Sequence, residues 1–339
     1  MFTEKHVLIT GGTGSYGRRL LDRLLDLTHP PESITIFSRD EEKQYHLAHE
    51  YKSPRIRFQV GDIRDPASVA RVLRGKQIVF NAAALKQVPT CEYAPREAIL
   101  TNIMGAENIV SAIERHQLPV ETVVGISTDK ACKPVNVMGM TKSIQERVFI
   151  QANLRAPTTR FVCVRYGNVL ASRGSVIPLF LKQARERQPL TVTDPTMTRF
   201  LLSLDEAVDT SLQALQFGLA GEVVVPRADS AYVGDIADVI SRRAGVPVVT
   251  VGIRPGEKRH EVMISEEEGP RVRDVGKWSH IMPMLEGLDQ FLARSGAESD
   301  SRSEYSSATA PISVSALEER LQTAGLLPGA SPSGAPQEV

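Results

Sequence analysis

The chain has 339 residues, of which 42% are hydrophobic and 24% are charged, and its 40 basic residues balance its 40 acidic ones. This composition is typical of a globular protein with a large core, and the charge balance argues against a nucleic-acid or anionic-membrane partner. Its apolar runs are shorter than the roughly 20 residues of a membrane helix. Three scattered cysteines favour a reducing compartment, and the chain begins directly on a predicted strand. We therefore expect a cytoplasmic protein without a signal peptide, a membrane segment or a metal site.

Six short apolar runs in the first half predict β-strands. Helical stretches separate most of them, and residues 18–27 place leucines at helical spacing. This repeated strand–helix order predicts an α/β fold, a Rossmann-type doubly wound parallel sheet with helices on both faces. The predicted strands are 6–10, 33–37, 57–60, 77–80, 122–126 and 161–166.

The regular alternation ends after Asn168, and we expect a smaller α/β lobe to follow. A strand at 221–225 and a helix at 236–243 are expected to return toward the main sheet. An amphipathic helix at 315–326, capped by Ser315, is predicted near the end of the chain. The expected division is 1–168 with parts of about 205–245 for a dinucleotide-binding domain, 169–294 mainly for a substrate lobe, and 295–339 for a polar arm, the last helix and a disordered tail.

A glycine loop follows the first strand and opens a helix. Its glycines allow a tight turn and close approach of the backbone to a pyrophosphate, which the free N–H groups of the helix N-terminus can bind. The second strand follows about 20 residues later, as in a dinucleotide-binding unit, so a glycine turn without a ligand is the less favoured alternative. The residues predicted to contact the cofactor here are Gly11, Thr13, Gly14, Ser15, Tyr16 and Gly17.

The end of the second strand bears on the choice of cofactor. NAD sites usually carry an acidic residue here, which binds the ribose 2′-hydroxyl. Ser38 and Arg39 come first in this chain and Lys43 follows one helical turn later, so a 2′-phosphate is better served. We expect NADP, with NAD as the alternative because of Asp40. Further cofactor contacts are expected from Asp62 and Ile63 beside the adenine and from the smooth wall of Ala82, Ala83 and Ala84.

An acid and a base follow the fifth strand directly. Asp129 and Lys130 lie at the carboxyl edge of the predicted sheet, where ligands bind in such folds, and a surface ion pair is the less favoured alternative. A buried lysine in a suitable site can have its pKa lowered enough to act as a base. Lys142 is preceded four positions earlier by Met138, whose thioether cannot exchange a proton at neutral pH.

These motifs resemble the extended short-chain dehydrogenases, and among them the UDP-N-acetylglucosamine 4,6-dehydratases of polysaccharide biosynthesis. Most short-chain dehydrogenases carry tyrosine where this chain has Met138, but longer, membrane-bound members of the dehydratase family often carry methionine. The resemblance runs from residue 6 to about residue 265. It is carried by GGTGSYG, FSRDEEK, GDIRD, AAALKQVPTCEYAP, TNIMGAENI, STDKACKPVNVMGMTK, VRYGNVLASRGSVIP, TDPTMTRF and GIRPGEKRHEVMI.

The resemblance implies oxidation of a sugar at C4 by NADP⁺, loss of the C6 hydroxyl and return of the hydride to C6, with inversion of C5 in some members. Asp129 would protonate the leaving C6 oxygen, and Lys130 would take the C5 proton. Ser127 or Thr128 would hold the C4 oxygen, and Lys142 would bind the nicotinamide ribose. Because Met138 cannot take the C4 hydroxyl proton, our hypothesis assigns that step to Asp129, Lys130 or a water.

The resemblance also implies a UDP-sugar substrate and a homo-oligomer, either a dimer or a hexamer. Two arginines from separate loops suit a pyrophosphate, although a solvated salt bridge is the commoner role of a single arginine. A 4-epimerase on the same scaffold and a non-catalytic nucleotide-binding protein are the alternatives. The residues expected to bind the substrate are Lys86, Asn168, Arg173, Ser175, Pro178, Arg199, Arg254 and Glu257.

Overall fold

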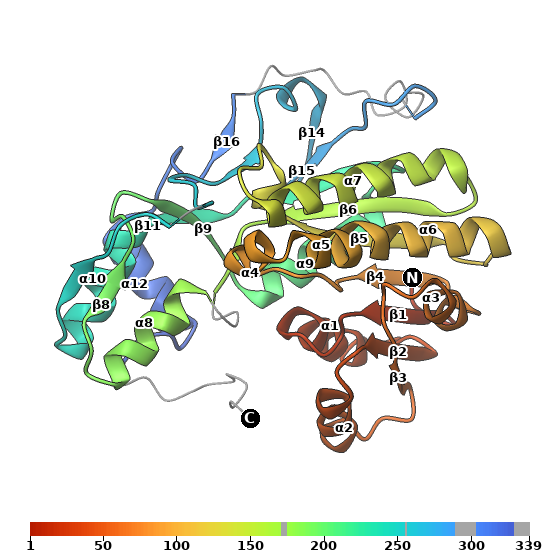
Figure 1. Ribbon diagram of the computed structural model, residues 1–339, viewed down its shortest axis with the longest axis horizontal. Helices are drawn as coiled ribbons and strands as arrows, with labels where there is room; N and C mark the ends of the chain where they lie inside the picture. The colour runs from red at the N-terminus through yellow and green to blue at the C-terminus, as the bar shows by residue number, and fades with distance from the viewer. Residues whose placement is uncertain (171–174, 255, 289–302, 329–339) are drawn as a thin grey trace. The chain divides into compact units, whose positions relative to one another are not determined.

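The computed structural model describes residues 1–170, 175–254, 256–288 and 303–328 (Figure 1). The chain divides into two compact units. The first unit comprises Met1–Tyr166, Leu204–Arg227 and Met263–Glu304, and the second comprises Gly167–Ser203, Ala228–Val262 and Tyr305–Val339.

Among the residues that the structure describes, a nine-stranded sheet forms the centre of the first unit. Its strands from β10 to β3 pair in parallel, whereas β15 pairs antiparallel with both β10 and β14. The order of β1 to β6 is that of a Rossmann fold, so the predicted fold class is confirmed. In spatial order the strands are β14 (Val272–Val275), β15 (Trp278–Ile281), β10 (Val223–Pro226), β6 (Arg160–Tyr166), β5 (Thr122–Thr128), β4 (Ile78–Asn81), β1 (His6–Thr10), β2 (Ser33–Ser38) and β3 (Ile56–Val60).

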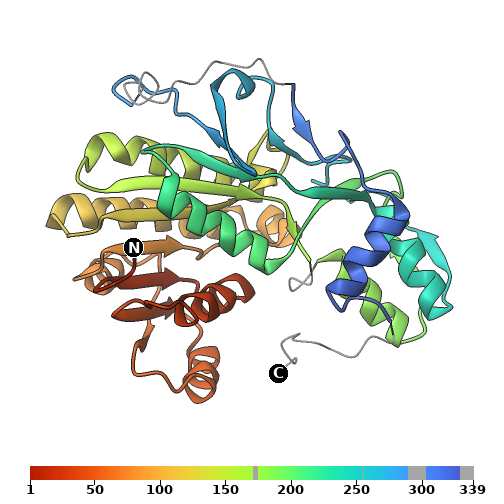
Figure 2. The ribbon, with the colours of Figure 1, turned by 180° about the vertical axis from the view of Figure 1, so that it is seen from behind.

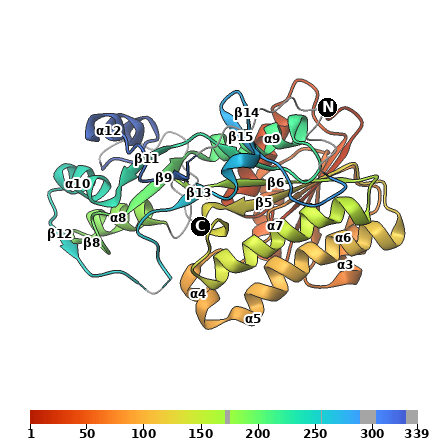
Figure 3. The ribbon, with the colours of Figure 1, turned by 90° about the horizontal axis from the view of Figure 1, so that it is seen from above.

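Helices cover both faces of this sheet, which explains why its central strands are apolar along their whole length. Figure 3 shows α3, α6 and α7 on one face and α9 on the other. Helix α1 lies beside α9 (Figure 2, dark red and green). The described helices of the first unit are α1 (Ser15–Leu25), α2 (Glu41–Glu50), α3 (Pro66–Leu73), α4 (Val88–Tyr93), α5 (Pro95–Ala98), α6 (Gly105–His116), α7 (Val137–Arg155) and α9 (Leu204–Phe217), with the π-helix η1 (Ile99–Met104) and the 3₁₀ helices η2 (Asp129–Ala131) and η3 (Gly269–Arg271).

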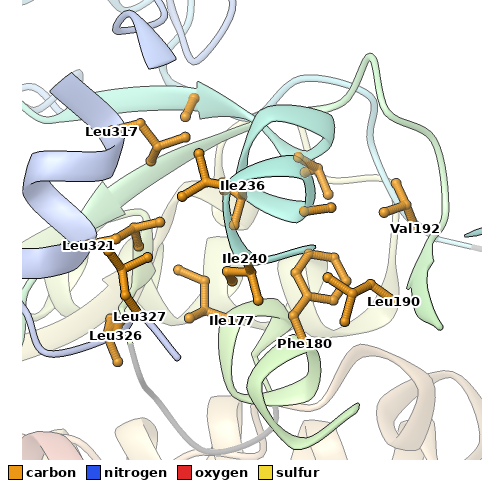
Figure 4. Close-up of a cluster of buried hydrophobic side chains, with 14 of the residues drawn as sticks. Ile177, Phe180, Leu190, Val192, Ile236, Ile240, Leu317, Leu321, Leu326 and Leu327 are labelled. Carbon is orange, nitrogen blue, oxygen red and sulfur yellow. The ribbon is translucent and has the colours of Figure 1, made fainter. Parts of the chain in front are cut away.

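The second unit has its own apolar core, formed where α8, α10 and α12 pack together with β8 (Figure 4). Ile177, Phe180, Ile236 and Leu317 are all buried in this core. The elements are β7 (Asn168–Val169), α8 (Val176–Arg185), β8 (Leu190–Val192), β9 (Thr198–Leu202), β11 (Asp229–Tyr232), α10 (Val233–Ala244), β12 (Val248–Thr250), β16 (Tyr305–Ser306) and α12 (Val314–Thr323), with β13 (Val262–Ile264) at the unit boundary.

Two details of the C-terminal part differ from expectation. Helix α12 begins at Val314, and its cap is Ser313, whose hydroxyl accepts a hydrogen bond from the Ala316 N–H at 3.3 Å. Ser315 lies inside the helix, so its predicted capping role was wrong. Part of the expected polar arm, residues 303–312, is described, and Ser307 within it is fully buried. The rest of that arm and the tail from 329 lie outside the described residues.

The division of the chain also differs from the expected one. Residues 263–288, expected in the substrate lobe, belong to the first unit because β14 and β15 extend its sheet. The described residues from 305 onward belong to the second unit. Among the described helices, none has the length and apolar character to cross a membrane.

Candidate functional site

The glycine loop packs closely against the chain that follows β4. Gly11 has a φ of +66°, and a Cβ at this position would lie 2.8 Å from the Ala82 carbonyl oxygen and from the Ala83 backbone. A Cβ at Gly17 would lie 2.5 Å from the Gly12 Cα. The loop therefore needs glycine at both positions for steric reasons. At Gly11, the missing side chain lets the loop backbone lie next to Ala82 and Ala83.

The N-terminus of α1 fits an anionic ligand. Its N-cap residue is Gly14, which has no side chain to cap the helix, and the first turn contains no acidic residue. The N–H groups of this turn are thus left without a side-chain cap, which is the arrangement that binds a pyrophosphate. The residues present therefore fit the dinucleotide that the sequence predicts.

The predicted 2′-phosphate residues lie together at the end of β2. The Arg39 side chain is 50% exposed, and its Nη1 lies 3.8 Å from Asp62 Oδ2. Lys43 pairs with Asp40, which also caps α2. The Ser38 hydroxyl accepts a hydrogen bond from Gln44 Nε2 at 3.1 Å. Of these two cations, Arg39 is thus the one less closely paired with a carboxylate, and it is the better placed to bind a phosphate.

Two of the other predicted cofactor residues hold neighbouring elements together. Ile63 is buried against Gly105, and its carbonyl accepts a hydrogen bond from Asn108 Nδ2 at 2.9 Å. The Tyr16 hydroxyl donates to Ser211 Oγ at 2.7 Å, and its ring stacks on Tyr166 with centroids 6.2 Å apart. Tyr16 therefore joins the glycine loop to α9 and to the end of β6.

Asp129 and Lys130 form the acid–base pair at the end of β5. The Asp129 side chain is completely buried, and its Oδ1 accepts hydrogen bonds from Lys130 Nζ at 3.0 Å and from Thr128 Oγ1 at 2.9 Å. The second oxygen, Oδ2, has no hydrogen-bond partner among the described residues. The Lys130 side chain is 18% exposed. The turn thus combines a buried acid, one unused oxygen and an amine within hydrogen-bonding distance.

Lys142 is buried on α7, next to β5. Its Nζ donates hydrogen bonds to the Ile126 carbonyl and, at 2.7 Å, to Gln145 Oε1. Burial lowers the pKa of Lys142 to about 8. Sequence reasoning missed Gln145, although its position three residues after Lys142 puts both side chains on one face of the helix.

Met138 lies in a small apolar cluster with Cys91 and Ala98 and is 4% exposed. The next residue, Gly139, packs against the Thr128-Asp129-Lys130 turn, because a Cβ there would lie 2.3 Å from the Lys130 carbonyl oxygen. The start of α7 therefore contacts the turn through a glycine backbone, while the methionine side chain is part of the apolar packing.

The residues predicted to bind the substrate fall in both units. Lys86 is exposed in the first unit. Arg199 on β9 donates from Nη1 to the carbonyls of Thr198 at 2.8 Å and Arg259 at 3.2 Å. Arg254 is exposed, Ser175 is the N-cap residue of α8, and Pro178 lies in the first turn of that helix. Arg173 lies outside the described residues.

Two of these residues have buried acceptors without a partner. Asn168 Oδ1 and Glu257 Oε2, both in the second unit, make no hydrogen bond within the part of the chain that the structure describes. A buried polar atom without a partner costs free energy, so such atoms mark positions where a ligand can supply the missing donor. Hydroxyl groups of a nucleotide sugar are donors of this kind.

This fold, with its glycine loop and its Thr128-Asp129-Lys130 turn, defines an extended short-chain dehydrogenase of the type that modifies nucleotide sugars. Residues 7–283 match the family described as "Polysaccharide biosynthesis protein", and the chain belongs to that family. It is 42% identical over 308 residues to the UDP-glucose 4-epimerase of Rickettsia canadensis (strain McKiel), covering 89% of each chain. It is also 42% identical over 300 residues to that of Rickettsia prowazekii (strain Madrid E), covering 87% of each.

Solved structures agree with this assignment. Pen from Bacillus thuringiensis superposes with a TM-score of 0.87 at 32% identity, covering 96% of this chain and 100% of its own. DesIV, a dTDP-glucose 4,6-dehydratase from Streptomyces venezuelae solved with NAD, has a TM-score of 0.68 at 22% identity, over 75% of this chain and 86% of its own. The likeness to DesIV shows a shared fold.

Proposed function

We propose that this chain is an NADP-dependent UDP-N-acetylglucosamine 4,6-dehydratase, which forms a 4-keto-6-deoxy sugar nucleotide. The observation that carries the proposal is the Asp129–Lys130 pair at the end of β5, where Asp129 is fully buried and its Oδ2 has no partner in the described part of the chain. Elimination of water across C5 and C6 needs a base for the C5 proton and an acid for the C6 oxygen. A 4-epimerase has no step at C5 or C6 that uses such a pair.

The pair can carry out both proton transfers of the elimination. Lys130, as the neutral amine, takes the proton from C5, and Asp129 gives a proton to the C6 oxygen, which leaves as water. When the hydride reaches C6, Lys130 returns a proton to C5, and Asp129 regains its proton from the C4 hydroxyl, so both groups end in their starting state. Lys130 Nζ lies 3.0 Å from Asp129 Oδ1, which places the two groups next to each other for these steps. A dinucleotide held by the glycine loop would supply the acceptor for the C4 hydride and its donor to C6.

The C4 hydroxyl proton needs a separate path, since Met138 cannot accept it. Thr128 Oγ1 donates to Asp129 Oδ1 at 2.9 Å. A C4 hydroxyl held at Thr128 would therefore be connected to the Asp129 carboxylate through one hydroxyl group. This path replaces the missing tyrosine with residues of the same turn.

The cofactor and substrate assignments rest on the residues described above. The exposed guanidinium of Arg39 supports NADP over NAD. The acceptors of Asn168 and Glu257, which have no partner among the residues that the structure describes, support a substrate rich in hydroxyl groups. We further propose that the enzyme works in the cytoplasm as a homo-oligomer, either a dimer or a hexamer.

The second candidate is a UDP-sugar 4-epimerase. It is favoured by the Rickettsia relatives, which are named UDP-glucose 4-epimerases and are 42% identical to this chain. An epimerase would return the hydride to C4 on the opposite face of the sugar and would leave the C5 hydrogen in place. The two candidates therefore differ in what happens at C5 and C6.

Proton NMR in deuterated water separates the candidates. The purified protein is incubated with NADP⁺ and UDP-N-acetylglucosamine, and in parallel with UDP-glucose. A new C6 methyl signal with deuterium at C5 is the expected result, and its coupling constants report the configuration at C5. Conversion of either sugar to its C4 epimer without deuterium at C5 would replace the proposal with the epimerase. Two unchanged sugars would overturn both candidates for these substrates.

A further inference from the structure

A buried charged cluster adjoins the catalytic turn and takes no part in the chemistry proposed above. It consists of Arg165 on β6, Glu146 on α7 and Glu268 just before η3, and we call it the Arg165 cluster. Their side chains are 3%, 4% and 11% exposed. Arg165 Nη2 lies 2.7 Å from Glu146 Oε2, and Arg165 Nη1 lies 2.8 Å from Glu268 Oε2. One guanidinium thus binds two carboxylates from distant parts of the sequence.

Each carboxylate also contacts a residue that flanks the catalytic turn. On the entry side, Ser127 Oγ donates to Glu146 Oε1 at 2.5 Å. On the exit side, the Cys132 thiol lies 3.6 Å from Glu268 Oε2, and the Cys132 N–H donates to the Asp129 carbonyl at 3.1 Å. The Arg165 cluster is therefore connected to the turn at both of its ends.

The same segment that carries Glu268 makes further contacts with the exit of the turn. Lys133 follows Cys132 in the left-handed region, with a φ of +45°, which is unfavourable for a residue with a side chain. It pairs with Glu266 and with Glu304. Arg165 Nη1 also donates to the Met263 carbonyl at 2.7 Å. These contacts hold the exit of the turn in a conformation that the local sequence disfavours.

Burial of three charges is costly, so such a cluster is weak evidence for stability, and in some proteins buried ionic groups instead specify one geometry. A fully hydrogen-bonded buried network favours one arrangement of its members, and the planar guanidinium fixes the direction of each bond. We propose that Arg165 is a positioning residue, which holds Glu146 and Glu268 so that Ser127 and Cys132 fix the Asp129–Lys130 pair in its working geometry. The catalytic part of this inference rests on the proposed function, whereas its structural part does not.

The arrangement also bears on how the substrate is held. The Ser127 hydroxyl is buried and donates its proton to Glu146. The Thr128 hydroxyl also donates to a carboxylate, that of Asp129, but Thr128 is only half-buried. Of the two residues expected to hold the C4 oxygen, Thr128 is therefore the more accessible one. Loosening the turn should lower kcat more than it raises KM, because a displacement of about 1 Å can cost about 100-fold in rate while the substrate still binds.

The test compares Glu268→Gln with Glu222→Gln. Glu222 is an equally buried carboxylate of the first unit, held by Arg273 Nε at 2.7 Å and His280 Nδ1 at 2.8 Å, and the structure gives it no contact with the turn. Amide hydrogen exchange of residues 128–133 is measured on the purified proteins, together with kcat and KM. For Glu268→Gln we expect exchange to rise by about tenfold or more and kcat to fall at least about tenfold, with KM changed less than about threefold.

For Glu222→Gln we expect exchange and kcat within about twofold of wild type, since the turn is not involved. Equal exchange of residues 128–133 in the two variants would overturn the proposal. If exchange is faster only in Glu268→Gln and the wild-type protein proves not to be a dehydratase, the positioning role stands and the proposed function is rejected. Faster exchange with an unchanged kcat would reject the catalytic part of the inference.

A milder pair of variants covers the case in which Glu268→Gln does not fold. Cys132→Ala removes the thiol that donates to Glu268, and Cys132→Ser restores a donor at this position. We expect faster exchange of residues 128–133 and a lower kcat in the alanine variant, with recovery of both in the serine variant. Identical behaviour of the two would overturn the contact as a positioning device.

Discussion

Lys130 Nζ lies 3.0 Å from Asp129 Oδ1, inside a turn whose aspartate is fully buried. An ion pair on the surface would leave both groups in water, where it contributes little. Here the aspartate lies at the carboxyl end of a buried strand, its Oδ2 has no partner among the described residues, and the lysine is close enough to exchange a proton with it. This relationship, more than any other in the molecule, predicts acid–base chemistry.

The first prediction concerns Asp129→Asn. The amide preserves the size of the side chain but cannot supply a proton, so kcat should fall by about 10² to 10⁴ with KM changed less than about threefold. Methyl formation followed by NMR provides the measurement. Asp205→Asn is a matched control, since Asp205 pairs with Arg19 on the surface and should leave turnover unchanged. A variant that keeps more than a tenth of wild-type kcat would remove Asp129 from the role of acid.

The second prediction concerns stability and pH. The pKa of Lys142 is lowered by burial from 10.5 to about 8. The unfolded state therefore binds this proton more tightly, and the contribution of Lys142 to stability rises with pH between about 8 and 10.5. Below pH 8, the full cost of charging the buried lysine is present. Lys142→Met, which carries no charge, should lack this pH dependence.

Urea unfolding at pH 7.5 and pH 10 provides the measurement. The stability of Lys142→Met relative to wild type should fall by about 2 kcal/mol between the two pH values, since one pKa unit corresponds to about 1.4 kcal/mol. Lys182→Met serves as the control because Lys182 is exposed, and its difference from wild type should stay constant. A constant difference for Lys142→Met would show that the lysine keeps its ordinary pKa in the folded protein.

The third prediction separates packing from catalysis at Met138. Because Met138 is buried against Cys91 and Ala98, Met138→Ala should lower the free energy of unfolding by about 2 to 5 kcal/mol, and Met138→Leu by less than about 1.5 kcal/mol. Turnover per folded molecule should persist in both variants. Met140 lies two residues later and is exposed, so Met140→Ala should change neither the free energy of unfolding nor the turnover. Loss of turnover with the fold intact would mean that the thioether takes part in the reaction.

The fourth prediction concerns the cofactor. If Arg39 binds the 2′-phosphate, Arg39→Ala should weaken NADP binding by about 10- to 100-fold, as expected for a lost hydrogen bond to a charged group, and leave NAD binding unchanged. Isothermal titration with each cofactor measures this directly. Arg71→Ala on α3 removes another exposed guanidinium and should affect neither cofactor. An equal loss of affinity for both cofactors would argue against a specific role for Arg39.

Much of the first unit could be predicted from the sequence. Strands β1 and β6 are apolar runs because both faces of a parallel sheet are covered by helices, so burial appears directly in the residue order. The glycine loop was predictable for a similar reason, since Gly11 needs a positive φ and Gly17 needs a close approach, and both requirements exclude other residues. Asp129 and Lys130 followed from their place directly after a buried strand.

The tertiary structure alone decided the remaining features. Ser313 rather than Ser315 caps α12, because capping depends on which hydroxyl reaches a free N–H. Strands β14 and β15 join the main sheet although they lie far along the chain. Arg165 meets Glu146 and Glu268 only after β6, α7 and the segment before η3 have packed together. The sequence by itself determined the features set by local sterics and by burial patterns, whereas contacts between distant charged residues depend on packing that no local pattern encodes.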